Sequence, residues 1–225
     1  MRQIKRAPRR AVERPGSAMT PMKTLDLEQT AVASFAASGG SASRSKYKTI
    51  VADPPWAYKR PLPGFPGDRD NASATPYSTM SIEEICALPV RELAEDDAHL
   101  YLWTTGTHLF KAEKVVEAWG FRVAQVLTWC KPPRGITVGA FSPTTEFAVF
   151  CRRGTLAALR RVDSTWWEWS RGAHSAKPEA FQDMVESVSP GPYLELFARR
   201  TRLGWHTWGN QSLCHVELVT PNEKS

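Results

Sequence analysis

The sequence has no run of about 18 apolar residues, and the basic N-terminal stretch has no continuous apolar segment of the kind that export signals carry. The four cysteines are widely spaced and form neither a CxxC motif nor a zinc-ligand pattern; they are Cys86, Cys130, Cys151 and Cys214. We therefore expect free thiols in a reducing compartment, a cytoplasmic location, no metal site and no membrane partner.

The chain does contain enough apolar material for a folded core. It has 225 residues, of which 42% are hydrophobic, and nine of them are tryptophans. This composition is typical of one sizeable globular domain and excludes a wholly disordered chain.

The net charge of +6 is concentrated near the N-terminus. Residues 1–48 carry ten Lys and Arg against three acidic residues, a net charge of +7, whereas residues 49–225 carry a net charge of −1. Residues 1–45 also lack any sustained periodicity, which predicts a disordered basic arm with a polyanion as its natural partner. A solubilising or cloning-derived extension fits that composition equally well. We expect a domain over residues 46–215 and a C-terminal tail over 216–225.

Strand patterns alternate with helix patterns through this domain. The helix patterns cover residues 107–119, which end at Gly120, residues 178–188, and a stretch that begins with the capping box Ser81–Glu84 and runs through about Leu88. Apolar runs predict strands over residues 47–52, 98–103, 121–131, 145–153, 192–200 and 204–209. The alternation indicates an α/β fold in which helices cover both faces of a mostly parallel sheet. Ligands bind such sheets beyond the carboxyl ends of the strands.

The stretch VADPPWAY, residues 51–58, places polar and aromatic groups where the first strand ends. Asp53 and a neighbouring carbonyl, fixed by Pro54 and Pro55, offer two acceptors for the two N–H donors of an exocyclic amine. The prolines lack N–H groups, so we expect the carbonyls of this turn to be unopposed. Trp56 and Tyr58 offer faces on which a planar base could stack. These features predict a pocket for a flipped-out adenine held by its N6 amine.

Each of these residues has a plainer interpretation. Asp53 could cap a turn, Lys177 could be an exposed lysine in the first turn of a helix, and His174 could be structural rather than a general base. We expect a second group of tryptophans to belong to the core, namely Trp103, Trp119, Trp129 and Trp205. Trp166, Trp167 and Trp169 cannot all point one way on a strand, so at least one should face a partner, the substrate or a loop.

The tetrapeptide Asp53–Trp56 resembles the DPPW signature of the MT-A70 family of N6-adenine methyltransferases. Further blocks follow in the family's order along residues 47–211, about three-quarters of the chain, and together they are far more specific than the tetrapeptide. They are Tyr77-Ser78-Thr79-Met80, Leu102-Trp103, Trp119-Gly120-Phe121, Leu127-Thr128-Trp129-Cys130-Lys131-Pro132, Thr145-Glu146, His174-Ser175-Ala176-Lys177-Pro178, Glu195-Leu196-Phe197-Ala198-Arg199 and Trp208-Gly209-Asn210-Gln211.

The resemblance implies a Rossmann-like class I methyltransferase with a permuted motif order and S-adenosylmethionine as cofactor. It implies that Asp53, Pro54, Pro55 and Trp56 form the catalytic motif. The cofactor would be bound by Asp53 at its amino group, Lys177 at its carboxylate, Phe197 and Arg199 at the ribose and adenosine, and Asn210 and Gln211 at the adenosine. The chain departs from the usual Rossmann pattern in one respect, because Ala198 and Arg199 follow Phe197 where a glycine-rich turn is usual.

Two loops rich in proline and glycine, residues 59–76 and 132–144, carry basic residues suited to phosphate contact and to closure over the pocket. The substrate-binding residues that we expect are Tyr58, Lys59, Arg60, Tyr77, Lys131 and Arg134.

The compact chain, with no zinc finger and no separate recognition domain, favours a bacterial or phage-type enzyme that methylates a flipped-out or single-stranded adenine in DNA. Three alternatives stay open: an RNA adenine methyltransferase, a catalytically inactive nucleic-acid scaffold, and a methyltransferase for a small molecule or a protein amide. The intact Asp53 and Lys177 favour an active enzyme over a scaffold. The sequence leaves a homodimer open.

Overall fold

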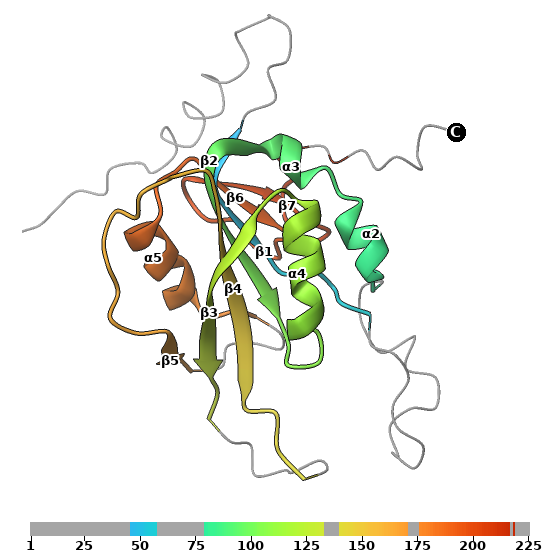
Figure 1. The fold of residues 1–225 in the computed structure, drawn as a ribbon, viewed down its shortest axis with the longest axis vertical. Coiled ribbons are helices and arrows are strands. Elements are labelled where there is room, and N and C mark those ends of the chain that lie inside the picture. Colours follow the sequence, from blue (N-terminus) through green and yellow to red (C-terminus); the bar gives the residue numbers. More distant parts are fainter. Residues whose placement is uncertain (1–45, 58–78, 133–139, 171–175, 217, 219–225) are drawn as a thin grey trace, which may run out of the picture. The chain divides into compact units, whose positions relative to one another are not determined.

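The computed structural model of the protein describes residues 46–57, 79–132, 140–170, 176–216 and 218, all of which lie in the compact unit Arg44–Ser225. The expected basic arm lies outside the described residues, as do most of the two substrate loops (Figure 1).

A seven-stranded sheet forms the centre of this unit, and its strands lie in the order β5-β3-β4-β2-β1-β6-β7. Neighbouring strands pair in parallel except around β4, which is antiparallel to both β2 and β3. The mostly parallel α/β sheet expected from the sequence is therefore confirmed. The strands are β1 (Tyr47–Ala52), β2 (Ala94–Thr104), β3 (Arg122–Cys130), β4 (Thr145–Arg153), β5 (Trp166–Glu168), β6 (Tyr193–Leu196) and β7 (Trp205–Trp208).

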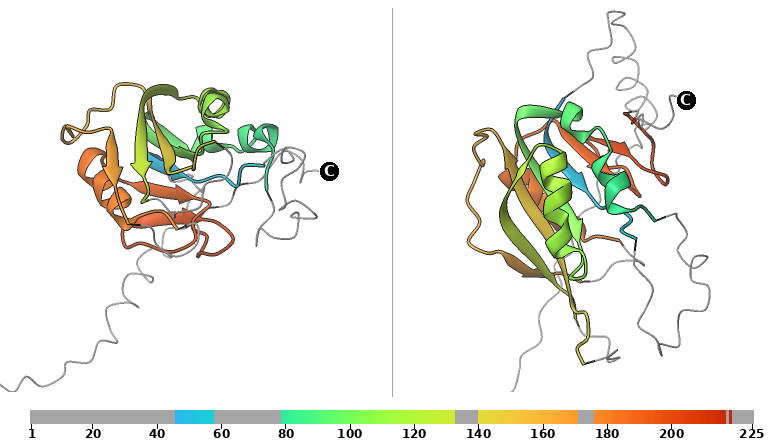
Figure 2. Two further views of the ribbon diagram at one scale, coloured as in Figure 1. Left: turned by 90° about the horizontal axis from the view of Figure 1, so that it is seen from below. Right: turned by 45° about the vertical axis from the view of Figure 1, so that its right-hand side comes forward.

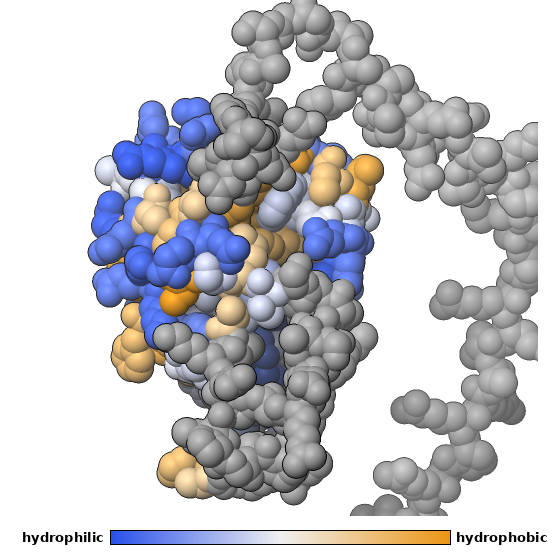
Figure 3. All heavy atoms as spheres, turned by 90° about the vertical axis from the view of Figure 1, so that its right-hand side faces the viewer, coloured by the Kyte–Doolittle hydropathy of each residue, from blue (hydrophilic) through white to orange (hydrophobic). Residues whose placement is uncertain are grey.

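Helices cover both faces of the sheet (Figures 1 and 2). The helices α2 (Ile82–Cys86), α3 (Val90–Leu93) and α4 (Leu109–Ala118) pack on one face, where their apolar residues share a core with those of β1, β2 and β6. The helix α5 (Glu179–Val188) packs on the other face against Val51, Tyr101 and Trp103. Hydrophilic side chains are interspersed with smaller apolar areas on the described part of the face seen in Figure 3.

Local signals in the sequence explain where several elements begin and end. The capping box is present, since the Ser81 hydroxyl accepts a hydrogen bond from the Glu84 backbone N–H and the Glu84 carboxylate accepts one from the Ser81 N–H. The helix that begins there is shorter than expected: α2 ends at Cys86, and Pro89 begins the separate helix α3. Gly120, with a φ of 80°, follows the end of α4 as expected.

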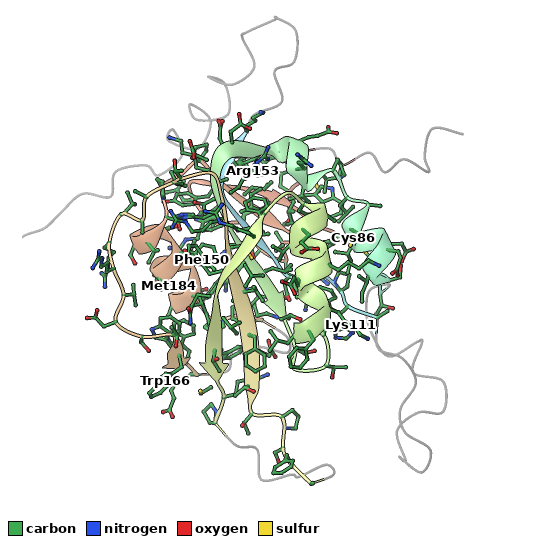
Figure 4. The ribbon with its side chains drawn as sticks, in the orientation of Figure 1. Cys86, Lys111, Phe150, Arg153, Trp166 and Met184 are labelled. Atoms are coloured by element: carbon green, nitrogen blue, oxygen red, sulfur yellow. The ribbon has the colours of Figure 1, made fainter. Side chains whose placement is uncertain are left out.

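The four tryptophans expected in the core are buried there: Trp103, Trp119, Trp129 and Trp205. Trp166 on the short edge strand β5 is exposed and extends away from the sheet (Figure 4), whereas the rings of Trp167 and Trp169 stack on each other. Alternation along an extended chain places residues 167 and 169 on one side and residue 166 on the other, in agreement with this arrangement. Among the described residues, none of the helices is long and apolar enough to cross a membrane.

Candidate active site

One edge of the sheet gathers most of the residues singled out in the sequence. Asp53 follows β1 and Phe197 follows β6, so both lie where parallel strands end. Because β4 runs in the opposite direction, its first residues, Thr145 and Glu146, lie at the same edge. Alternation along the strands directs Val51 and its register partner Glu195 to the face that α5 covers, and Asp53 continues that alternation.

Four charged side chains of alternating sign meet at this edge. The Lys177 Nζ atom lies 2.8 Å from the Asp53 Oδ2 atom and 3.3 Å from the Glu146 Oε2 atom. Lys131 forms an ion pair with the other oxygen of Glu146. The Lys177 ammonium also lies 5.1 Å from the centre of the Trp103 ring, a cation–π contact. Lys177, Asp53 and Glu146 are each 22% exposed at the side chain, so water screens these pairs only partly.

The pKa values in this network follow from burial and from the neighbouring charges. Burial acts to lower the pKa of Lys177, but the carboxylates of Asp53 and Glu146 more than offset it and hold that pKa above its ordinary value. Burial acts to raise the pKa of Glu146, yet Lys177 and Lys131 hold it below its ordinary value. Lys177 and Glu146 are therefore both charged at neutral pH.

Two neighbouring cavities open at this edge and share Asp53, Phe197 and Arg199 in their walls. The first encloses about 630 Å³, part of it open to solvent, and its walls include Met80, Trp208, Asn210 and Gln211. The second encloses about 490 Å³, and its walls include Trp103, Lys177, Gln182, Glu195 and Arg200. Asp53 thus lies in the wall that the first cavity shares with the second, charged one.

The turn that separates β6 from the first cavity has an unusual backbone. Phe197 adopts a φ of 62°, a conformation that residues with a side chain rarely take, and the Ala198 N–H donates to the Trp208 carbonyl oxygen at 3.0 Å. A Cβ atom on Gly209 would lie 2.6 Å from the Ala198 backbone nitrogen and closer still to the Ala198 carbonyl oxygen. The glycine that permits close approach of backbones at this edge is therefore Gly209, at the end of β7, and the turn after β6 needs none.

Replacement of Gly209 by alanine is expected to push the turn after β6 away from β7 and so to distort the first cavity. Overpacking of this kind costs about 1–3 kcal/mol of the free energy of unfolding. Urea unfolding measures the loss. Gly106→Ala is a matched control, because its Cβ would meet its nearest atom at 3.9 Å. Equal stability of the two variants would contradict the close approach.

The turn formed by Asp53–Trp56 differs in two ways from its expectation. The Trp56 ring is buried, donates from Nε1 to the Trp103 carbonyl oxygen at 3.0 Å and stacks on His108, so the expectation that it offers a stacking face to a base is wrong. The carbonyls of the turn are not unopposed: Pro54 accepts from the Trp56 N–H at 2.9 Å, and Pro55 accepts from the Met80 N–H at 2.8 Å. Trp56 anchors the turn that presents Asp53.

The structure brings together all six residues expected at the cofactor. Asp53, Phe197 and Arg199 border both cavities, Asn210 and Gln211 border the first, and Lys177 borders the second. Of the residues expected at the substrate, Lys131 pairs with Glu146 and extends toward the Trp129 ring. The others lie outside the described residues: Tyr58, Lys59, Arg60, Tyr77 and Arg134.

Two carboxylates of the site were not expected from the sequence as functional groups. Glu146 begins a strand rather than ending one, and only the antiparallel direction of β4 brings it to this edge. Glu195 lies within a strand whose alternation could have indicated it, because it is a charged residue between the buried Leu194 and Leu196. No three His, Cys, Asp or Glu side chains are grouped as metal ligands in the part of the chain that the structure describes.

Comparison with known proteins gives a consistent result. The family model described as MT-A70 matches residues 47–211. The chain is 32% identical to the Type II methyltransferase M.MunI from Mycoplasma sp, over 74% of this chain and 78% of that protein. It is 30% identical to an N(6)-adenosine-methyltransferase MT-A70-like protein of Drosophila melanogaster, over 78% of this chain and 28% of that protein. The human N(6)-adenosine-methyltransferase catalytic subunit METTL3 is 26% identical over 79% of this chain and 30% of its own length.

Proposed function

Because the chain belongs to the MT-A70 family, whose methyltransferases use S-adenosylmethionine, we propose that it transfers the methyl group of that cofactor to the N6 amine of an adenine in nucleic acid. The observation that carries the proposal is the position of Asp53, which directly follows the interior strand β1, borders both cavities and pairs with Lys177. The name N(6)-adenosine-methyltransferase, which several similar proteins share, supports adenine N6 as the acceptor.

The residues that line the two neighbouring cavities suit the cofactor in their chemistry. Asn210 and Gln211 offer amides to an adenosine in the first cavity, and Lys177 offers an ammonium to a carboxylate in the second. Arg199 and Phe197 lie between them. The bound cofactor supplies an activated methyl group on a sulfonium, so the protein needs chiefly to position the acceptor amine.

Asp53 would act on the amine by accepting a hydrogen bond and by favouring positive charge on its nitrogen. The lone pair of an adenine amine is delocalised into the ring, and a carboxylate close to it stabilises the pyramidal form that accepts a methyl group. The Pro54 carbonyl oxygen has one lone pair left beyond its bond to Trp56 and would serve as the second acceptor. The ion pair with Lys177 keeps the Asp53 carboxylate in place.

We propose DNA rather than RNA as the substrate, with the target adenine flipped out or single-stranded. The alignment with the Type II methyltransferase covers most of both chains, whereas it covers less than a third of the N(6)-adenosine-methyltransferases reported above. This favours the compact organisation that we associate with DNA enzymes.

Incubation with labelled S-adenosylmethionine and separate DNA, RNA and protein pools tests the proposal. We expect label in the DNA pool, recovered as N6-methyldeoxyadenosine after digestion to nucleosides. Label in N6-methyladenosine from RNA would support the RNA alternative, and label in protein would overturn a nucleic-acid substrate. Nucleic-acid binding without transfer to any pool would support the inactive scaffold.

A further inference from the structure

Glu195 is a carboxylate of the charged cavity to which the proposed mechanism gives no role. It lies on β6, in register with Val51 on β1 and Thr207 on β7, so its side chain is directed to the face that α5 covers. It borders the same cavity as Asp53 and Lys177. A half-buried acid in such a position needs either a partner or a function.

The hydrogen bond that the Glu195 carboxylate accepts comes from a neutral side chain. Gln182 on α5 donates from Nε2 to the Glu195 Oε2 atom at 2.7 Å, and its own Oε1 accepts from Arg200 at 3.1 Å. Arg200 also pairs with Glu179 at 2.9 Å. Within the described ranges, no Lys, Arg or His lies within ion-pair distance of Glu195. The Glu195 carboxylate is thus linked to the Arg200 guanidinium only through the Gln182 amide.

The charges around Glu195 leave its ionisation finely balanced. Burial raises its pKa to about 7; Arg200 and Arg202 act to lower it, and Asp53 acts to raise it. Lys177 is held by Asp53 and Glu146, Arg202 is held by Asp183 and Glu186, and β7 contributes only the uncharged Thr207 in register. The half-protonated state therefore falls close to neutral pH.

The ionisation of Glu195 changes the net charge of the site by the same amount by which the cofactor and its demethylated product differ. Lys131 and Lys177 are balanced by Asp53 and Glu146, and Arg200 is balanced by Glu179. Arg199 also lines the cavity, and ionisation of Glu195 lowers the net charge of the site by one. S-adenosylmethionine carries one net positive charge, with a sulfonium, an ammonium and a carboxylate. Its demethylated product lacks the sulfonium and is neutral.

We propose that Glu195 balances the charge of this site: its carboxylate is ionised while the cationic cofactor is bound and takes up a proton when the neutral product remains. The inference rests on the proposed function and deepens it. Methylation of an amino nitrogen forms one N–C bond, breaks the S–C bond of the donor and releases one N–H proton. The Glu195 carboxylate takes up one proton as the sulfonium charge is lost, so the net charge of the cleft is the same before and after transfer.

Isothermal titration calorimetry of the full chain at pH 6 and pH 8 tests this inference through binding. Wild-type protein must lose the Glu195 proton to bind S-adenosylmethionine, and with a pKa of about 7 this weakens the affinity about tenfold between pH 8 and pH 6. Glu195→Gln keeps an oxygen that accepts from Gln182 but cannot ionise. For each protein, the dissociation constant at pH 6 is divided by the one at pH 8. We expect this ratio to be about tenfold smaller for Glu195→Gln than for the wild type. The cofactor's own ionisation is the same with both proteins and cancels in this comparison.

S-adenosylhomocysteine is the matched probe, because it lacks the sulfonium charge. Because the proposal has Glu195 protonated beside the neutral product, we expect the wild-type affinity for this ligand to fall from pH 6 to pH 8 relative to that of Glu195→Gln, in the opposite direction to the cofactor. Glu117→Gln removes an exposed carboxylate on α4, on the opposite face of the sheet, and should leave the wild-type pattern with both ligands unchanged.

The possible outcomes separate this inference from the proposed function. Equal pH dependence of wild type and Glu195→Gln with S-adenosylmethionine overturns the role of Glu195 and leaves the methyltransferase intact. Failure of the wild-type protein to bind either ligand overturns both. Thermal unfolding checks that the variant folds: it should be at least as stable as the wild type at pH 8, where the wild type carries an ionised, half-buried carboxylate.

Discussion

Replacement of Asp53 by asparagine is expected to lower the rate of methyl transfer by about 100- to 1,000-fold while the protein stays folded. Asparagine keeps the size of the side chain and one acceptor oxygen but removes the negative charge beside the reacting amine. That charge is needed most in the transition state, when the nitrogen becomes positive, so the loss should fall on kcat more than on KM. Radiometric transfer to DNA at saturating substrate measures it.

Asp96→Asn is the matched control for this variant. Asp96 lies near the start of β2, at the opposite edge of the sheet from Asp53, and its exposed side chain pairs with Arg153. We expect this variant to retain wild-type turnover. A folded Asp53→Asn enzyme with wild-type kcat would remove Asp53 from the mechanism, and an equal loss in both variants would point to a general effect on the fold.

Local sequence signals predicted the starts and ends of elements that depend only on neighbouring residues. The capping box of Ser81 and Glu84, the left-handed Gly120 and the apolar run of β1 need no distant partner to be recognised. The end of β6 could not be predicted in this way. The apolar and charged pattern continues to residue 200, but β6 ends at Leu196, Phe197 takes a left-handed backbone conformation, and the backbone of the next residue, Ala198, lies close to Gly209, which follows β7.

The residues of the site also divide into those that local sequence predicted and those that depend on distant contacts. Asp53 and Phe197 could be placed at one edge because parallel strands end together. Glu146 could not, since the direction of β4 depends on its pairing with β2 and β3 rather than on its own residues. Glu146 was missed as a member of the site, whereas Trp56 was wrongly assigned to it. An aromatic residue beside a polar turn suggested a base-stacking surface, but the Trp56 ring is a buried anchor of the turn. Pairing and packing decide such cases, and both depend on residues far away in the sequence.

Lys177 connects the stability of the site with its binding function. Replacement by methionine keeps the length of the side chain but leaves the Asp53 carboxylate without the cation 2.8 Å away and Glu146 with Lys131 alone. Removing one member of a buried ion pair costs about 3–5 kcal/mol. The side chains here are partly exposed, so we expect a loss of about 2–3 kcal/mol in the free energy of unfolding at pH 7. We also expect the dissociation constant for S-adenosylmethionine to rise at least about tenfold, since the ammonium that would bind its carboxylate is gone.

The pH dependence distinguishes a lost ion pair from lost packing. The pKa of Glu146 is held below its ordinary value in the folded protein, so its contribution to stability is present above about pH 4.5 and disappears as the pH falls through the folded-state pKa. The stability difference between wild type and Lys177→Met should therefore be largest near neutral pH and shrink in acid, as measured by urea unfolding. Lys114→Met, which removes an exposed lysine paired with Glu83, should change neither stability nor cofactor affinity noticeably. A stability loss that persists unchanged into acid would assign the effect to packing against Trp103, and an unchanged cofactor affinity would remove Lys177 from the binding site.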